Sequence, residues 1–168
     1  MRIRSLTFED GLYLFIFGLA LALRLFSLGA APLTDAEASW ALQALDLARG
    51  EQPQIGAQAA YVLLTSLSFA MFNASNFFAR LLPALAGGLL ALLPALLRPL
   101  LGSSSRLRWI GLVLALGLAV DPGLVSLSRT AGSLMPALAF STLALALFAR
   151  REMVWAGITA GLALLAGP

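Results

Sequence analysis

Runs of apolar residues separated by short polar stretches constrain the fold of this chain more than any other feature. Sixty per cent of the 168 residues are apolar and 11% are charged, whereas about 25% of the residues in a soluble domain are charged. A chain of this length cannot bury so much apolar surface in one core, so lipid is the expected solvent. The predicted fold class is an all-α membrane protein, a bundle of several transmembrane helices.

Five apolar runs predict membrane-spanning helices. The first, residues 11–28, has a signal peptide as its alternative, but its length and the charge of Arg24 favour a retained helix. A sixth run, residues 61–72, reaches only about 18 Å against a hydrocarbon core of about 30 Å, so we expect it to lie on the membrane. The predicted spans lie in a single region, 1–168, near residues 11–28, 77–97, 107–122, 133–149 and 153–168, with residues 29–76 as one outer loop.

The distribution of arginine predicts the orientation of these spans. With residues 61–72 outside the membrane, seven of the eleven arginines lie on the cytoplasmic side and four on the outer side. If residues 61–72 crossed the membrane, these counts would be reversed, against the positive-inside rule. We therefore predict a multi-pass protein of the cell membrane, plasma or inner, with a cytoplasmic N-terminus and membrane lipids as partners. The arginines are scattered, so no nucleic-acid partner is expected.

Three absent residue types narrow the chemistry that the chain can perform. It contains no Cys, no His and no Lys. Thiol nucleophiles, imidazole bases, zinc sites built on His or Cys, and lysine Schiff bases are therefore excluded. Acid–base catalysis would have to use carboxylates, and an anion would have to bind to arginine or to helix N-termini.

An acidic segment follows the first apolar run. Residues 32–53 hold four of the eight acidic residues of the chain. Thr34 and Glu37 have the spacing of a capping box, which predicts that a helix begins at Asp35. Gly50 is a typical helix stop. Polar residues recur at helical spacing on a narrow stripe of this helix, so we expect it to lie in the membrane interface.

Several motifs occur in an order that resembles a known family. The first helix is followed by the acidic loop TDAEASWALQALDLARGEQP, an apolar segment that begins YVLLTSLSFAMF, the helix motif ARLLPALAGG and, after the next helix, DPGLVSLSRTAG. Together they resemble the N-terminal part of the GT-C superfamily of membrane glycosyltransferases, in particular the protein O-mannosyltransferase and aminoarabinose transferase group. The resemblance covers nearly all 168 residues.

The resemblance implies an activity and a donor. Members of this family move a sugar from a polyprenyl-phosphate donor to an acceptor on the outer membrane face, and they invert the anomeric centre. A carboxylate of the first loop deprotonates the acceptor hydroxyl, and basic side chains hold the lipid phosphate. The acceptor, a lipid, a protein or a glycan, stays open, and so does the sugar. Family members are several times longer, and this chain stops inside an apolar run, so we expect it to be the front portion of a longer polypeptide.

Asp35 and Glu37 are the two candidates for the catalytic base. The family motif has adjacent acids, whereas Ala36 separates them here, so both candidates are kept, with Asp35 favoured. Each also has a structural alternative. Glu37 would complete the capping box with Thr34, and Asp35 would be stabilised by the positive end of the helix dipole.

Four further residues are candidates for binding the donor phosphate or the substrate. Arg80 lies near a helix N-terminus, and Arg129 matches an arginine of the family motif. For both, anchoring in the lipid headgroup region is the alternative. Asp121 is a second acid of the site, a metal ligand or the end of a helix, with Arg129 as its expected partner. Arg24 is expected to pair with an acid of the outer loop, because an unpaired arginine in hydrocarbon costs several kcal/mol or more. No metal site or cofactor is predicted, although a divalent cation stays open.

Two other functions are alternatives. A lipid or solute transporter would need charged or broken helices near the bilayer midplane, whereas the charges of this chain lie near the ends of its apolar runs. A non-catalytic multi-pass membrane scaffold would need no reactive carboxylate. The glycosyltransferase is the preferred interpretation.

Overall fold

A computed structural model describes residues 7–54, 56, 58–101 and 105–167, and all regular structure among them is helical. This confirms the predicted all-α class. Arg2, Arg4 and most of the turn predicted at residues 102–106 lie outside the described residues. The helices are α1 (Phe8–Leu25), α2 (Asp35–Ala48), α3 (Ala59–Phe72), α4 (Asn76–Leu90), α5 (Leu93–Leu101), α6 (Ser105–Val120), α7 (Pro122–Ser128), α8 (Leu134–Ala149) and α9 (Met153–Ala166).

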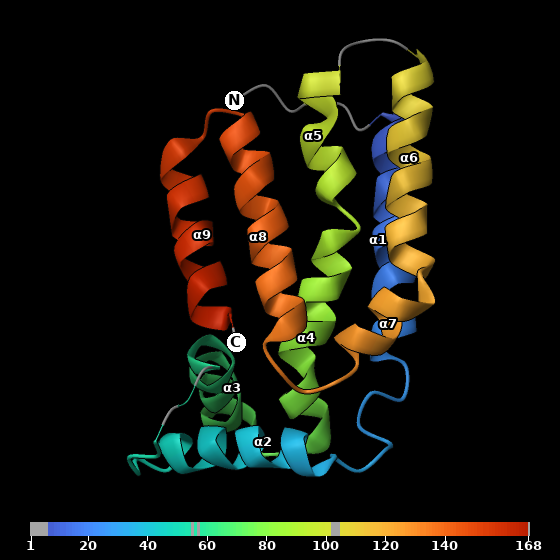
Figure 1. Cartoon of the computed structure of the whole chain (residues 1–168). Coiled ribbons are helices and arrows are strands. Elements are labelled where there is room, and N and C mark those ends of the chain that lie inside the picture. Colours follow the sequence, from blue (N-terminus) through green and yellow to red (C-terminus); the bar gives the residue numbers. More distant parts are fainter. Residues whose placement is uncertain (1–6, 55, 57, 102–104, 168) are drawn as a thin grey trace.

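The long helices run side by side and α2 crosses one end of the bundle (Figure 1). The end of α5, the start of α6 and the α8–α9 connection lie at the end of the bundle where α1 begins, whereas α2, α3 and α7 lie at the other end. We call these the Arg98 end and the α2 end. α4 packs against both α1 and α8, so it occupies the centre of the bundle. The long helices thus run up and down in the order that the sequence predicts. Residues 61–72 form a helix at the α2 end that does not run the length of the bundle.

The apolar runs form helices close to their predicted limits, with two breaks at which the chain turns. α4 and α5 follow one another closely and together include the predicted span 77–97. The predicted span 107–122 corresponds to α6, and α7 follows it at a bend of 52°. Pro122 causes this bend, because it has no N–H to continue the hydrogen bonding of α6. α7 itself is not predicted from the sequence.

Few of these helices have both the length and the composition of a membrane span. Among the described residues, Asn76–Leu100 form a segment that is long enough and apolar enough to span a membrane. α6 with α7 would form a second span if the bent pair is counted as one. α1 has 18 residues but carries three charged side chains. α8 and α9 have 16 and 14 residues, or about 24 and 21 Å, against a hydrocarbon core of about 30 Å. Five spans therefore stay a prediction.

Small side chains form the contacts between the helices. One buried cluster joins α1, α5 and α6 around Tyr13, Ile16 and Ala115. A second cluster joins α2, α3 and α4 around Ala44, Tyr61 and Ala79. Alanine lets helix backbones approach closely, as it does in membrane helix bundles. Many large apolar side chains instead face outward, including those of Val113 and Leu114 on α6 and Val154, Trp155 and Leu164 on α9.

Candidate functional site

The N-terminus of α2 is fixed by the capping box that the sequence predicts. The Thr34 hydroxyl accepts a hydrogen bond from the Glu37 backbone N–H at 3.4 Å. The Glu37 carboxylate in turn accepts from the Thr34 backbone N–H at 2.9 Å and from the Thr34 hydroxyl at 3.1 Å. Two of the N–H groups that a helix start leaves without partners are thereby satisfied.

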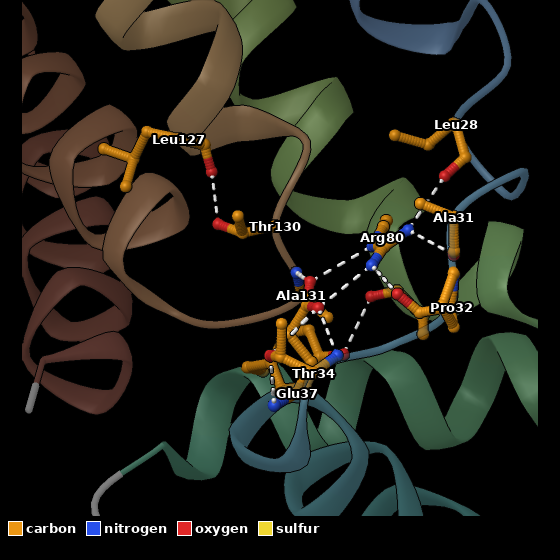
Figure 2. A network of polar contacts seen from close by, with 11 residues as sticks. Leu28, Ala31, Pro32, Thr34, Glu37, Arg80, Leu127, Thr130 and Ala131 are labelled. Carbon is orange, nitrogen blue, oxygen red and sulfur yellow. Dashed lines mark hydrogen bonds and ion pairs between the residues drawn. The ribbon is translucent and has the colours of Figure 1, made fainter.

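Glu37 also forms a buried ion pair with Arg80 of α4 (Figure 2). Arg80 Nη2 lies 2.9 Å from Glu37 Oε2 and Arg80 Nε lies 3.1 Å from Oε1. The two side chains are only 7% and 6% exposed. The backbone N–H of Ala131 donates to Glu37 Oε1 at 2.6 Å. Glu37 therefore joins α2 to α4 and to the loop between α7 and α8.

The remaining donors of Arg80 hold the loop between α1 and α2. Nη1 donates to the carbonyl oxygens of Leu28 and Ala31, and Nη2 donates to that of Pro32. Together with the two bonds to Glu37, these contacts use all five N–H groups of the guanidinium. Arg80 thus has no donor left for a phosphate, which argues against the phosphate-binding role predicted for it.

The ionisation of Glu37 follows from these contacts. Burial by itself would raise the pKa of Glu37, but the hydrogen bonds from Arg80, Thr34 and Ala131 and the charge of Arg80 outweigh it and hold the pKa at about 2. A carboxylate with so low a pKa, with both oxygens already accepting hydrogen bonds, is a poor general base at neutral pH. The geometry therefore assigns Glu37 a structural role.

Asp35 differs from Glu37 in its exposure and in its contacts. It is the first residue of α2, its side chain is exposed, and it makes no side-chain hydrogen bond or ion pair with the described residues. The backbone that carries it is fixed, because Glu37 lies only two positions further along the same helical turn. Asp35 is therefore an unengaged carboxylate held in a defined place.

The predicted pairing of Arg24 with an acid of the outer loop is wrong. Arg24 is fully buried and donates to the carbonyl oxygens of Leu118 and Ala119 at 3.1 and 2.8 Å, besides that of Ala20 in its own helix. The final carbonyls of α6 lack helical partners, and Pro122 has no N–H to offer to Leu118. Backbone carbonyls at the broken end of α6 thus take the place of the expected carboxylate.

The expected pair between Asp121 and Arg129 is also wrong. Asp121 caps α7, and its Oδ1 accepts from the Leu124 N–H at 2.7 Å. Arg129 Nη1 donates to the carbonyl oxygens of Leu23 and Phe26 at 2.9 and 2.8 Å. The arginine therefore caps the C-terminus of α1, where the carbonyls need donors. Asp121 has the structural role that the sequence offered as its alternative.

The loop between α7 and α8 is an unpredicted part of this site. Besides the Ala131 contact with Glu37, the Ser133 N–H donates to Gln58 Oε1 at 3.0 Å. Gly132 lies so close to Trp40 of α2 that an added Cβ would be 3.2 Å from its ring. Backbone N–H groups supply both hydrogen bonds. Since every residue except proline has such a group, no residue type in the sequence predicts these contacts.

No cluster of three or more acidic residues that could hold a metal ion occurs within residues 7–54, 56, 58–101 and 105–167. The site therefore comprises one exposed carboxylate, Asp35, beside a buried network centred on Glu37 and Arg80. No protein-family model, curated protein or solved structure matches this chain.

Proposed function

We propose that this chain is the N-terminal membrane region of a GT-C-like glycosyltransferase that moves a sugar from a polyprenyl-phosphate donor to an acceptor hydroxyl on the outer membrane face. Asp35 acts as the general base. It takes the proton of the acceptor hydroxyl while the oxygen attacks the anomeric carbon. The bond from that carbon to the phosphate oxygen breaks, the lipid phosphate leaves with the electron pair, and the anomeric centre is inverted.

The contrast between Asp35 and Glu37 is the observation that supports this proposal most. A general base must be accessible to the acceptor and must lie within hydrogen-bond reach of its proton. Asp35 is exposed, while the ion pair two residues away fixes the turn that carries it. Rigid support of this kind is what a catalytic side chain needs to keep its geometry.

Arg129 is the arginine best suited to contact the leaving phosphate. Arg80 has no free donor, and Arg24 is fully buried. Arg129 is only half-buried, and its Nε–H has no partner among the described residues. Ala131, in the loop that follows Arg129, donates a hydrogen bond to Glu37. Arg129 lies two residues before Ala131, and Asp35 lies two residues before Glu37.

The membrane setting of the proposal is supported by the surface of the bundle. Outward-facing Trp109 and Ile110 of α6 and Leu145 and Phe148 of α8 give it an apolar exterior, which in a soluble monomer would be unusual. α5 and α8 both end at the Arg98 end (Figure 1). Arg98 lies in the last turn of α5 and Arg150 caps α8, so the positive-inside rule would place the cytoplasm there. Several short helices would then cross the membrane together with the longer α4–α5 segment.

The test measures transfer of labelled sugar from polyprenyl-phosphate donors in membranes that contain the protein. Asp35→Asn should lower transfer by about 10²–10⁴-fold, the contribution of a general base, with the amount of protein in the membrane unchanged. Glu51→Gln, which removes another exposed acid of the same loop, is the matched control and should transfer normally. Normal transfer by Asp35→Asn would exclude Asp35 as the base.

A non-catalytic membrane scaffold is the second candidate. The specific observation in its favour is that five of the six predicted site residues serve internal contacts. These are Arg24, Glu37, Arg80, Asp121 and Arg129. Under this alternative, Asp35→Asn would give the same sugar transfer as wild type and would have the same free energy of unfolding.

A further inference from the structure

A cavity of about 820 Å³ opens at the Arg98 end of the bundle, away from Asp35. It lies between α1, α5, the start of α6 and the end of α8. Three arginines line it, Arg98, Arg108 and Arg150, with Asp10 as the acidic residue of its lining. The wall of the cavity therefore carries a net positive charge, which suits an anionic ligand.

The arginines of this cavity are engaged to different degrees. Arg98 bonds to Asp10 at 2.7 Å and to Glu9 at 2.6 Å, and Arg108 bonds to Glu9 at 2.8 Å. These side chains remain between 22% and 47% exposed, so donors of both guanidiniums stay accessible. Arg150 makes no side-chain hydrogen bond or ion pair with the described residues. An anion entering the cavity would thus meet the unengaged guanidinium of Arg150 and those of Arg98 and Arg108, which are already bound to carboxylates.

The inner part of the same cavity is apolar and adjoins a second cavity. Leu14 and Phe17 of α1 line its inner part. Leu92, which directly precedes α5, and Ala95 and Leu96 of α5 line both this cavity and one of about 560 Å³ between α4, α5 and α8. Since residues three and four apart share one helix face, one face of α5 borders both cavities. The whole lining is thus charged at the end of the bundle and apolar toward its middle.

We propose that this cavity binds an anionic phospholipid of the membrane leaflet at the Arg98 end. The phosphate contacts Arg150 and the accessible donors of Arg98 and Arg108, and an acyl chain extends along Leu92 and Leu96. A soluble anion would use the charged part alone, and a neutral lipid would leave the guanidiniums without a partner. The proposal shares the membrane setting of the proposed function and is independent of its transferase chemistry.

The test counts phospholipids that stay bound to the purified protein, by native mass spectrometry after exchange from micelles of phosphatidylcholine with phosphatidylglycerol. We expect phosphatidylglycerol to be retained in preference to phosphatidylcholine. Arg150→Gln should reduce this retention about fivefold, the effect of one basic side chain at a lipid headgroup. Arg49→Gln, an exposed arginine of the α2 end, is the matched control and should retain the lipid as wild type does.

A second variant tests the apolar part without changing charge. Ala95→Leu fills the space beside the shared face of α5 and should also lower retention, while circular dichroism reports whether both variants keep the fold. The proposal is overturned if both variants retain phosphatidylglycerol like wild type, if phosphatidylcholine is retained equally, or if millimolar inorganic phosphate displaces the lipid completely. The two proposals can fail separately. Phosphatidylglycerol retention can be absent while sugar transfer is normal, or sugar transfer can be absent while retention is normal.

Discussion

The α2 end of the bundle holds one buried ion pair, whereas the Arg98 end holds a chain of partly exposed ones. Glu37 and Arg80 have side chains no more than 7% exposed. The side chains of Glu9, Asp10, Arg98 and Arg108 are between 22% and 47% exposed. Water can screen and replace the second set of contacts but not the first. The same pairing of Arg with carboxylate should therefore fix the fold at one end and leave the other end open to a ligand.

The two ends reach the same ionisation by different routes. At the α2 end, hydrogen bonds and the Arg80 charge overcome the effect of burial and hold the pKa of Glu37 at about 2. At the Arg98 end, hydrogen bonds from Thr7 and then from Arg98 lower the pKa of Asp10 to about 2. Because the side chain of Asp10 is 35% exposed, a similar pKa there implies much less stabilisation.

The largest effect is expected from Arg80→Ala. The substitution leaves an ionised carboxylate buried without a cation and removes the donors to three backbone carbonyls. Breaking a buried pair in this way costs about 3–5 kcal/mol. The measurement is the free energy of unfolding in urea, for the purified protein in micelles, followed by far-UV circular dichroism.

Arg98→Ala is the matched control for that measurement. Its cost should be about 1 kcal/mol or less and should shrink in 1 M NaCl, where the Debye length is about 3 Å. The cost of Arg80→Ala should not change with salt. Equal costs for the two variants, or an equal salt dependence, would mean that burial does not distinguish the two ends.

A smaller effect is expected from acid. Because the pKa of Glu37 in the folded protein lies below its usual 4.5, its stabilisation is complete above pH 4.5 and is lost as the pH falls toward 2. Between pH 7 and pH 3 the loss should be about 2 kcal/mol. The stability difference between wild type and Glu37→Gln should narrow by this amount over that range.

Asp10→Asn gives the corresponding comparison at the Arg98 end. The difference between wild type and this variant should narrow over the same pH range, because the pKa of Asp10 is also lowered, but by a smaller amount. If the stability difference narrowed more for Asp10→Asn than for Glu37→Gln between pH 7 and pH 3, the buried pair at the α2 end would not be the more stabilising one.

The smallest effect concerns two glycines. A Cβ at Gly87 of α4 would lie 2.6 Å from the Cβ of Ser128 and 2.8 Å from Nε of Arg24. Overpacking of this kind costs about 1–3 kcal/mol, and the helix propensity of Ala returns up to about 1 kcal/mol. Gly87→Ala should therefore lower the free energy of unfolding by about 1 kcal/mol.

Gly111→Ala on α6 is the comparison variant for Gly87→Ala. Its Cβ would meet Oη of Tyr13 at 2.7 Å. Tyr13 also lines the cavity at the Arg98 end, so its hydroxyl has space to move into, unlike the atoms around Gly87. We expect its stability to stay within about 0.5 kcal/mol of wild type. A larger loss from Gly111→Ala, in the same urea titration, would show that the Arg98 end is packed as tightly as the α2 end.

Much of the fold could be predicted because its signals are local. Apolar runs bounded by polar residues predict most of the helices, and the short length of residues 61–72 predicts that this segment does not run through the bundle. The membrane sides inferred from the arginines stay a prediction. Thr34 and Glu37 set the start of α2, as the capping box requires. α7 was missed because a seven-residue helix after Asp121 and Pro122 looks in sequence like the end of the preceding one.

The candidate site could be predicted less well. Arg24, Arg80 and Arg129 were expected to bind anions, but all three donate to backbone carbonyls, and Arg80 does so in addition to its ion pair with Glu37. The choice between Asp35 and Glu37 was open in the sequence, because two acids two residues apart on one helix have similar local surroundings. In the structure the two acids differ because Glu37 alone is bound by Arg80 and Ala131, which lie 43 and 94 residues from it; Asp35 as the base stays a proposal.

The sequence by itself determined that the chain is helical, where α2 begins, and which residue types are present to do chemistry, because propensity, capping and composition act between near neighbours. Only the tertiary structure decided which charged groups remain unengaged. A guanidinium is satisfied equally well by a carboxylate, a phosphate or a carbonyl oxygen, and the carbonyls that need donors appear only when helices end or bend against one another.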